Sequence, residues 1–212
     1  MPSLFYIHDP MCSWCWAFRP IKQRLWSAIK TQSFPVVEIL GGLAPDTEEP
    51  MPQDLQTQLQ HTWQRIQQTV PGTVFNYEFW TQNTPRRSTY RACRAVIIAQ
   101  QQTQDADATD AMTHAIQRAY YLEAKNPSDT ETLIECARQV GLSIEHFEKK
   151  LDSDVTRELH QQQMTLANAL EVGGYPSLVW VDGRRRLTPI HIDYNNHAAI
   201  EKQIAALAAA EI

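Results

Sequence analysis

Two cysteines three positions apart are the residues of this sequence best suited to chemistry. Cys12 and Cys15 enclose Ser13 and Trp14 in a Cys-x-x-Cys motif. At the start of a helix two such sulfurs can close a small disulfide, and the first one faces unpaired N–H groups and the positive end of the helix dipole. In such motifs the thiol pKa falls to roughly 3.5–7.5, which favours the thiolate that attacks disulfides. We therefore expect Cys12 to be a nucleophile and the deeper Cys15 to resolve a mixed disulfide.

The segments around the motif predict a βαβ unit that would position it. Residues 4–7 are an aromatic and branched run typical of a short buried strand. A helix is expected from about residue 12 to residue 29, and residues 36–40 form a second apolar strand that ends at a pair of glycines. Strand, helix and strand in close succession predict a parallel pair of strands.

The C-terminal part of the chain predicts two more strands and a closing helix. Residues 177–181 are apolar, the Asp182-Gly183 dipeptide is a strong hairpin signal, and residues 185–192 form the returning strand. A final helix is expected from about residue 196 to residue 210. Between residues 45 and 172, apolar residues recur at helical spacing on a glutamine-rich background, which indicates a long helical block with a solvated outer face.

Composition excludes several classes of protein. The 212 residues carry a net charge of −5, which argues against a dedicated nucleic-acid binder. The longest uninterrupted apolar run, residues 204–210, is far shorter than the ~20 residues of a membrane span. The first residues lack the basic start and the apolar stretch of a secretion signal. We therefore expect a cytoplasmic protein without a membrane partner, in which four cysteines do not form a disulfide scaffold.

Half of a zinc site is one alternative interpretation of the Cys-x-x-Cys motif, and an inert pair is another. A structural zinc site needs two more ligands at comparable spacing, and the other two cysteines are isolated. Cys93 and Cys136 both lie in apolar helical stripes, where buried unreactive thiols are the favoured interpretation, although a second redox pair between them stays open. The histidines form no metal-binding spacing, so no metal site is expected.

The residues from Asp9 to Phe18, together with the order of elements, resemble the DsbA-like thioredoxin-fold disulfide oxidoreductases. Within that family they are similar to the cytosolic protein-disulfide isomerases predicted from sequence, including FrnE-like proteins. The resemblance implies an α/β, thioredoxin-like fold with a large all-helical insertion between a βαβ half and a ββα half. Residues 1–44 and 172–212 would then form a discontinuous thioredoxin-like domain, and residues 45–171 would form the insertion domain.

A second motif, Gly173 to Ser177, carries the rest of the resemblance. In the family the proline that precedes this strand is cis and faces the two cysteines, and the residue before it offers backbone groups to an extended substrate. The resemblance therefore assigns substrate binding to Tyr175 and Pro176. The ring of Trp14, beside the first cysteine, is expected to be exposed and to give substrates an apolar landing surface. Pro20 matches a proline that kinks the active-site helix in the family.

One departure from the family concerns proton transfer. Thioredoxin-like proteins often bury an acid six residues before the nucleophile, but that position is Tyr6 here, a poor base at neutral pH. Asp9 or His8 could substitute as a proton carrier, or could simply be a turn former and a polar strand end. Ser13 could donate a hydrogen bond to the thiolate, or could cap the helix.

The sequence thus predicts a thiol–disulfide oxidoreductase or protein disulfide isomerase that acts on protein thiols and disulfides. Its redox-active disulfide would be its own, so no cofactor is expected, with glutathione as a conceivable thiol co-substrate. A second enzyme hypothesis is a glutathione-dependent isomerase or transferase, similar to 2-hydroxychromene-2-carboxylate isomerases and kappa-class glutathione transferases. A third hypothesis is a client-binding module with a structural Cys-x-x-Cys motif. Client, redox potential and oligomeric state stay open.

Overall fold

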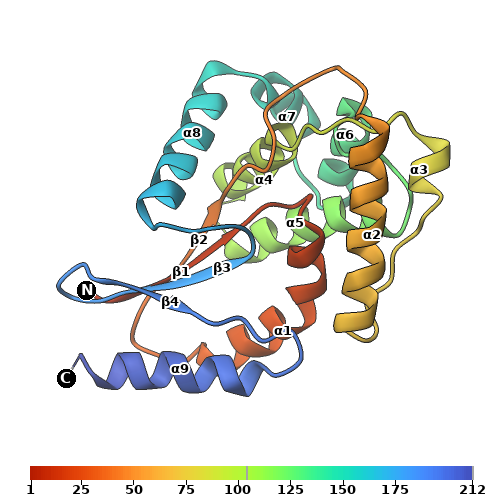
Figure 1. Ribbon diagram of the computed structural model, residues 1–212. Helices are drawn as coiled ribbons and strands as arrows, with labels where there is room; N and C mark the ends of the chain where they lie inside the picture. The colour runs from red at the N-terminus through yellow and green to blue at the C-terminus, as the bar shows by residue number, and fades with distance from the viewer. Residues whose placement is uncertain (104, 212) are drawn as a thin grey trace.

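The computed structural model describes residues 1–103 and 105–211 of the chain. It contains a four-stranded sheet in the order β2-β1-β3-β4 (Figure 1). The strands are β1 (Ser3–His8), β2 (Val36–Leu40), β3 (Ser177–Val181) and β4 (Leu187–Ile190). β1 pairs parallel with β2 and antiparallel with β3, and β3 pairs antiparallel with β4. The helices are α1 (Ser13–Ile29), α2 (Gln53–Thr69), α3 (Phe79–Gln82), α4 (Tyr90–Thr103), α5 (Ala106–Tyr121), α6 (Thr130–Gln139), α7 (Ile144–Leu151), α8 (Asp154–Ala169) and α9 (His197–Ala209).

The sheet lies between two layers of helices. α1 and α9 cover one face, where Phe18, Ile21 and Leu25 of α1 pack with Leu4 of β1 and Ile200 of α9. These α1 residues recur three or four positions apart, so one helix face carries the apolar side chains that the sheet buries. α8 covers the opposite face through a smaller apolar cluster that includes residues of β1, β2 and β3. Figure 1 shows α9 and α8 on opposite sides of the strands.

Helices α2 to α8 lie between β2 and β3 in the chain and share a large apolar core. That core also contains Met11, Ala17 and Leu40, which flank the cysteine motif and end β2. The helical block therefore packs directly against the end of the sheet where the cysteines lie. None of the described helices is both long enough and apolar enough to cross a membrane.

The structure confirms the predicted thioredoxin-like α/β fold with its βαβ and ββα halves. The hairpin between β3 and β4 is centred one residue later than predicted, because the N–H of Arg185 closes a turn on the carbonyl of Asp182. Arg185 adopts a positive φ of 64° there. The short helix α3 is not among the predicted elements. The division into two domains stays a prediction, and its ranges include residues 104 and 212, which lie outside the described residues.

Candidate active site

Cys12 is the N-cap residue of α1, immediately after the loop that follows β1. Its Sγ accepts the backbone N–H of Cys15 at 3.3 Å, which satisfies one of the free donors at the helix start. The same sulfur lies 3.2 Å from the carbonyl oxygen of Tyr175. Cys12 therefore sits where the backbone of α1 can stabilise negative charge on sulfur and where the loop before β3 reaches it.

Cys15 lies in the first turn of α1 and is more deeply buried than Cys12, with 1% against 5% of its surface exposed. Burial raises the pKa of the Cys15 thiol well above its usual value, and the neighbouring Cys12 raises it further. All four cysteines are free thiols in this structure. The deeper thiol, Cys15, therefore stays protonated at neutral pH.

The loop before β3 brings Tyr175 and Pro176 to the cysteines, and the Tyr175–Pro176 peptide bond is cis. The ring of Tyr175 packs on Gly41, at the end of β2. A Cβ atom placed on Gly41 would lie less than 3.0 Å from the ring atoms Cζ and Cε1 and from the hydroxyl oxygen of Tyr175. Glycine at position 41 is therefore what allows the Tyr175 ring to lie against β2.

Asp9 is a fully buried carboxylate between β1 and α1. Its Oδ1 accepts the N–H of Met11 at 2.7 Å, and its Oδ2 accepts the N–H of Leu43 at 2.9 Å and the hydroxyl of Thr89 at 2.7 Å. The backbone carbonyl of Asp9 also accepts the N–H of Cys12. One side chain thus joins the cysteine loop, the segment after β2 and the start of α4. Its predicted proton-carrying role stays a prediction.

His8 and Tyr6 lie under α1 as part of a buried polar cluster. Their rings stack at 4.7 Å, and His8 Nε2 lies 3.5 Å from Glu38 Oε2 on β2. Lys22 of α1 donates to Glu38 at 3.1 Å and lies 3.0 Å from Asp110 of α5. Burial raises the pKa of Tyr6 well above its usual value, and the nearby Cys15 and Glu38 raise it further. Tyr6 therefore stays neutral, and the charged groups of this cluster are Lys22 and the carboxylates that pair with it.

Replacing Lys22 by methionine is expected to lower the free energy of unfolding by about 3 kcal/mol at pH 7, because two carboxylates lose a buried cation. Burial favours a higher pKa for Glu38, but the neighbouring His8 and the charge of Lys22 outweigh it, and the pKa is lowered. Burial likewise favours a higher pKa for Asp110. Arg19 and Lys22 outweigh this effect, so the pKa of Asp110 is also lowered. A carboxylate whose pKa is lowered in the folded protein stabilises the fold at a pH above its usual pKa of about 4. This stabilisation is lost as the pH falls towards the lowered pKa of the folded state.

The Lys22→Met deficit is therefore expected to shrink below about pH 4. Urea unfolding at pH 7 and at pH 3.5 measures it. Lys30→Met, at an exposed position just after α1, is the matched control and is expected to change stability by less than about 0.5 kcal/mol. A deficit of the same size at both pH values would contradict the charge argument.

Trp14 is partly buried, whereas the sequence predicts an exposed ring. It packs on Tyr194, which precedes α9, with ring centroids 5.0 Å apart. Ser13 is the first residue of α1, but the capping position belongs to Cys12, and no hydrogen bond of the Ser13 hydroxyl occurs among the described residues. Trp16 is also partly buried and donates its indole N–H to the carbonyl of Val74 at 3.1 Å.

The remaining cysteines lie in the helical block. Cys93 and Cys136 are both buried and unpaired. Burial raises the pKa of Cys93 well above its usual value and that of Cys136 to about 12. Within residues 1–103 and 105–211, no group of three or more His, Cys, Asp or Glu side chains is placed to hold a metal ion.

Sequence reasoning did not find several residues that build this site. Thr89, Lys22 and Tyr194 each reach it through contacts between segments far apart in the chain. Local patterns carry no signal for such contacts. The pair Gly41-Gly42 was visible as a strand terminator, but only the packed ring of Tyr175 shows why the first glycine is required.

Comparisons with known proteins agree with this geometry. A proposed protein disulfide isomerase from Nitrosomonas europaea is 25% identical and superposes with a TM-score of 0.84, covering 100% of this chain and 99% of its own. The cytosolic disulfide reductase DsbM from Pseudomonas aeruginosa is 23% identical, with a TM-score of 0.74 and coverage of 96% and 99%. DsbM has also been solved with GSH.

A curated relative has a different described role. The ClpXP adapter protein SpxH from Halalkalibacterium halodurans is 24% identical over 182 residues, which are 84% of this chain and 58% of the relative. This chain thus spans little more than half the length of the curated relatives it matches. The family model described as "Thioredoxin" matches residues 5–202. The chain therefore belongs to this thioredoxin family, and its fold is that of the DsbA-like oxidoreductases.

Proposed function

We propose that this protein is a thiol–disulfide oxidoreductase that reduces or isomerises disulfides through Cys12 and Cys15. The observation that carries the proposal is the position of Cys12 Sγ, which accepts the N–H of Cys15 at a helix start and faces the Tyr175 carbonyl. A nucleophile, a buried resolving thiol and a backbone acceptor for substrate thus meet at one point. A reducing, cytoplasmic environment suits reduction or isomerisation better than net oxidation.

The proposed reaction has two exchange steps. The Cys12 thiolate attacks one sulfur of a substrate disulfide, the substrate S–S bond breaks, and the departing thiolate takes a proton. Cys15 then attacks Cys12 Sγ, its own proton passes to the second substrate sulfur, and the Cys12–Cys15 disulfide forms. The pair loses two electrons and the substrate disulfide gains two. A thiol such as glutathione, or a second protein thiol, returns the pair to its reduced state.

Substrate binding is proposed for the loop that faces Cys12. The carbonyl of Tyr175 can accept an N–H from an extended peptide next to the attacked sulfur, as an added strand would. Pro176 holds that carbonyl towards the cysteines, and the partly buried ring of Trp14 offers apolar contact on the other side. Protein thiols and disulfides, or glutathione, fit this short and sequence-tolerant contact.

Equilibration in glutathione buffers of set potential tests the proposal. Alkylation followed by mass spectrometry is expected to show Cys12 and Cys15 changing together as one two-electron couple, for which a tenfold change in the equilibrium constant is about 30 mV. Cys93 and Cys136 are the internal controls and are expected to stay reduced, because both are buried and unpaired. A Cys12–Cys15 pair that never changes its oxidation state would refute the proposal.

A variant at Cys15 distinguishes the glutathione-dependent isomerase hypothesis from the oxidoreductase proposal. Such an enzyme needs one reactive residue at position 12, so isomerase activity towards a small substrate would survive Cys15→Ser. Redox turnover would not survive it. A client-binding module would retain its client after Cys12→Ser with no loss of function, whereas the proposed enzyme loses its attacking atom.

A further inference from the structure

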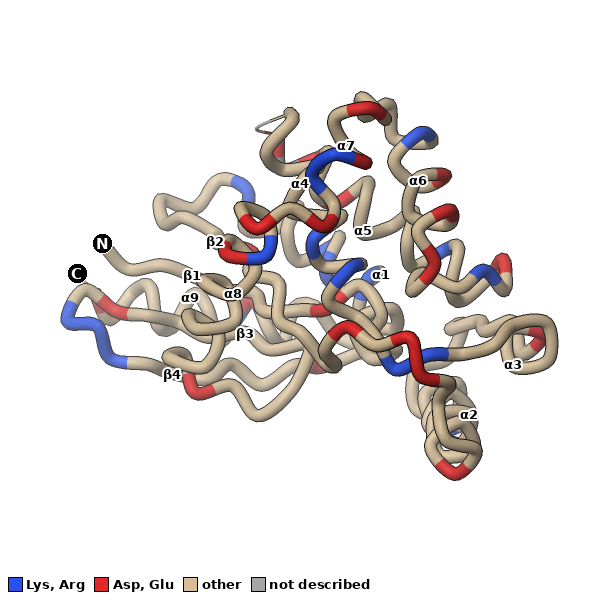
Figure 2. The backbone as a smooth tube through the Cα atoms, turned by 90° about the horizontal axis from the view of Figure 1, so that it is seen from above, with Lys and Arg blue, Asp and Glu red and all other residues tan. Residues whose placement is uncertain are grey.

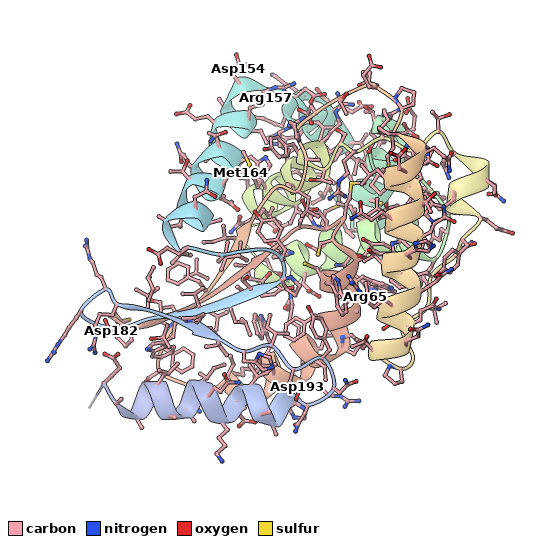
Figure 3. The ribbon with its side chains drawn as sticks, viewed as in Figure 1. Arg65, Asp154, Arg157, Met164, Asp182 and Asp193 are labelled. Carbon is pink, nitrogen blue, oxygen red and sulfur yellow. The ribbon has the colours of Figure 1, made fainter. Side chains whose placement is uncertain are left out.

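Arg65 lies at the edge of the active site although it belongs to the helical block. Its guanidinium carbon is 5.8 Å from the centroid of the Trp14 ring, and Trp14 is two residues from Cys12. Figure 3 shows Arg65 on α2, with its side chain between α2 and α1. A guanidinium near an aromatic face gains about 0.5–1 kcal/mol at an exposed site, so Trp14 helps to hold the side chain in place.

Arg65 lacks the ion pair that most arginines of the helical block make. Each of those arginines lies within 4.0 Å of at least one carboxylate: Arg86, Arg91, Arg94, Arg118 and Arg157. No carboxylate of the described residues lies that close to Arg65. The one acidic residue of α2, Asp54, is about 16 Å away along the helix at about 1.5 Å per residue. Figure 2 shows α2 as a largely uncharged helix.

A cavity of about 760 Å³ lies next to this edge. It runs along α1, and Tyr194, the ring that packs on Trp14, is part of its lining. Its lining includes Arg19 and Arg24 but neither Asp nor Glu. Arg19 is paired with both carboxylate oxygens of Asp110, whereas Arg24 is exposed and has no carboxylate of the described residues within 4.0 Å. Asp193 precedes Tyr194, but its Oδ1 already accepts two backbone N–H groups of the following loop. In a chain with a net charge of −5, Arg24 and Arg65 are thus two cations on this side of the site without a paired carboxylate.

We propose that Arg65 binds a carboxylate of the substrate whose sulfur is attacked by Cys12, and so selects carboxylate-bearing disulfides. This inference rests on the proposed function. The five N–H donors of a guanidinium match a carboxylate in a two-point contact, and here they face solvent beside the attacked sulfur. The Tyr175 carbonyl thus lies 3.2 Å from Cys12 Sγ, and the Arg65 guanidinium lies over the ring of Trp14, two residues further along the chain.

Single-turnover kinetics of the reduced protein test the inference. The three probes are glutathione disulfide, its fully esterified form without carboxylates, and cystamine, which carries only ammonium groups. In each case Cys12 joins one half of the symmetrical disulfide, Cys15 displaces it, and two thiols leave as the pair is oxidised. Trp14 and Trp16 next to the cysteines give a fluorescence signal for the reaction.

The wild-type protein is expected to react fastest with glutathione disulfide. Arg65→Gln is expected to lower that rate about fivefold, the size of an exposed ion pair of about 1 kcal/mol, and to leave the ester and cystamine rates unchanged. Arg65→Lys should retain part of the preference. Arg138→Gln, another exposed arginine without an ion pair, is the matched control because it changes the net charge equally on a helix that packs on α4, α5 and α7.

An unchanged preference in Arg65→Gln, or an equal loss in Arg138→Gln, would overturn the inference. If the wild-type protein reacts with all three disulfides at equal rates, the inference fails and the proposed function stands; if it reacts with none, the proposed function fails. A pair of peptide disulfides with Glu or Gln beside the cysteine identifies the source of the carboxylate. If the wild-type protein prefers the Glu peptide and Arg65→Gln loses this preference, the carboxylate belongs to protein clients. If the wild-type protein prefers only glutathione disulfide, the carboxylate belongs to the small thiol.

Discussion

Cys15→Ala is expected to accumulate as a mixed disulfide on Cys12, whereas Cys12→Ala is expected to lose turnover by about a thousandfold or more, as enzymes do without their nucleophile. In the Cys15 variant the attacking sulfur remains at the helix start with its Tyr175 contact. The first exchange step therefore proceeds. Release then depends on external thiol, because the neighbouring sulfur that would break the bond is gone.

The expected slowing of release is large. A well-oriented neighbouring group reaches effective concentrations of about 10⁵ M or higher, and millimolar external thiol cannot match that. Even with a much less favourable alignment, we expect the mixed disulfide to persist at least about 100-fold longer than in the wild-type protein. Non-reducing mass spectrometry after a single addition of a peptide disulfide measures the adduct and its lifetime.

Cys136→Ala is the matched control for both variants, since it removes a buried thiol of α6 that lies outside the reacting pair. It is expected to turn over at the wild-type rate with a stability loss of about 1 kcal/mol from the small cavity. A Cys15 variant that releases substrate at the wild-type rate would show that another group resolves the adduct. An adduct on a cysteine other than Cys12 would remove the proposed nucleophile.

The parts of the fold that sequence predicts are those whose patterns are local. The apolar positions of α1 recur at helical spacing, and residues 36–40 form a mostly apolar strand before two glycines, so their elements match the structure closely. Cys12 and Cys15 are three residues apart, and their relation at a helix start follows from helix geometry alone. The site is predictable to the extent that it lies within one segment.

The rest of the site comes from contacts that no local pattern encodes. A lysine such as Lys22 would be expected in solvent from the sequence alone. It is buried because Glu38 of β2 and Asp110 of α5 both lie within ion-pair distance of its ammonium group. The carboxylate of Asp9 is bound by the hydroxyl of Thr89, eighty residues further along the chain. Partners at such separations are brought together by the tertiary fold, so only the structure shows that Thr89 binds the carboxylate that also holds the N–H of Met11 in the cysteine loop.

Gly41→Ala is expected to lower the rate of disulfide exchange about 10- to 100-fold, because it would displace the loop that faces Cys12. The new methyl group would collide with the ring of Tyr175, at distances that real Cβ atoms do not show. The backbone of Gly41 cannot move away easily. Its N–H donates to the carbonyl of His8 at 2.7 Å, and the Nε2 of the buried His160 lies 2.5 Å from its carbonyl oxygen.

The strain of Gly41→Ala therefore falls on Tyr175, and with it on the carbonyl that lies 3.2 Å from Cys12 Sγ. Overpacking of this kind costs about 1–3 kcal/mol of stability, which thermal unfolding measures beside the exchange rate. Gly174→Ala is the matched control, one residue before Tyr175 in the same loop. Its added Cβ would meet no atom within 4 Å, and its φ is not in the left-handed region, so rate and stability are expected to stay near wild type.

A double-mutant cycle shows whether the loss passes through the ring of Tyr175. In a Tyr175→Ala background the methyl group at position 41 has no ring to meet, while the backbone carbonyl at position 175 is retained. The stability cost of Gly41→Ala should then fall to less than about 0.5 kcal/mol, a coupling of the size seen for residues in direct contact. An equal stability cost in both backgrounds would instead place the strain in the Gly41 backbone, which is held by His8 and His160. The loss of exchange rate would then not be explained by displacement of Tyr175.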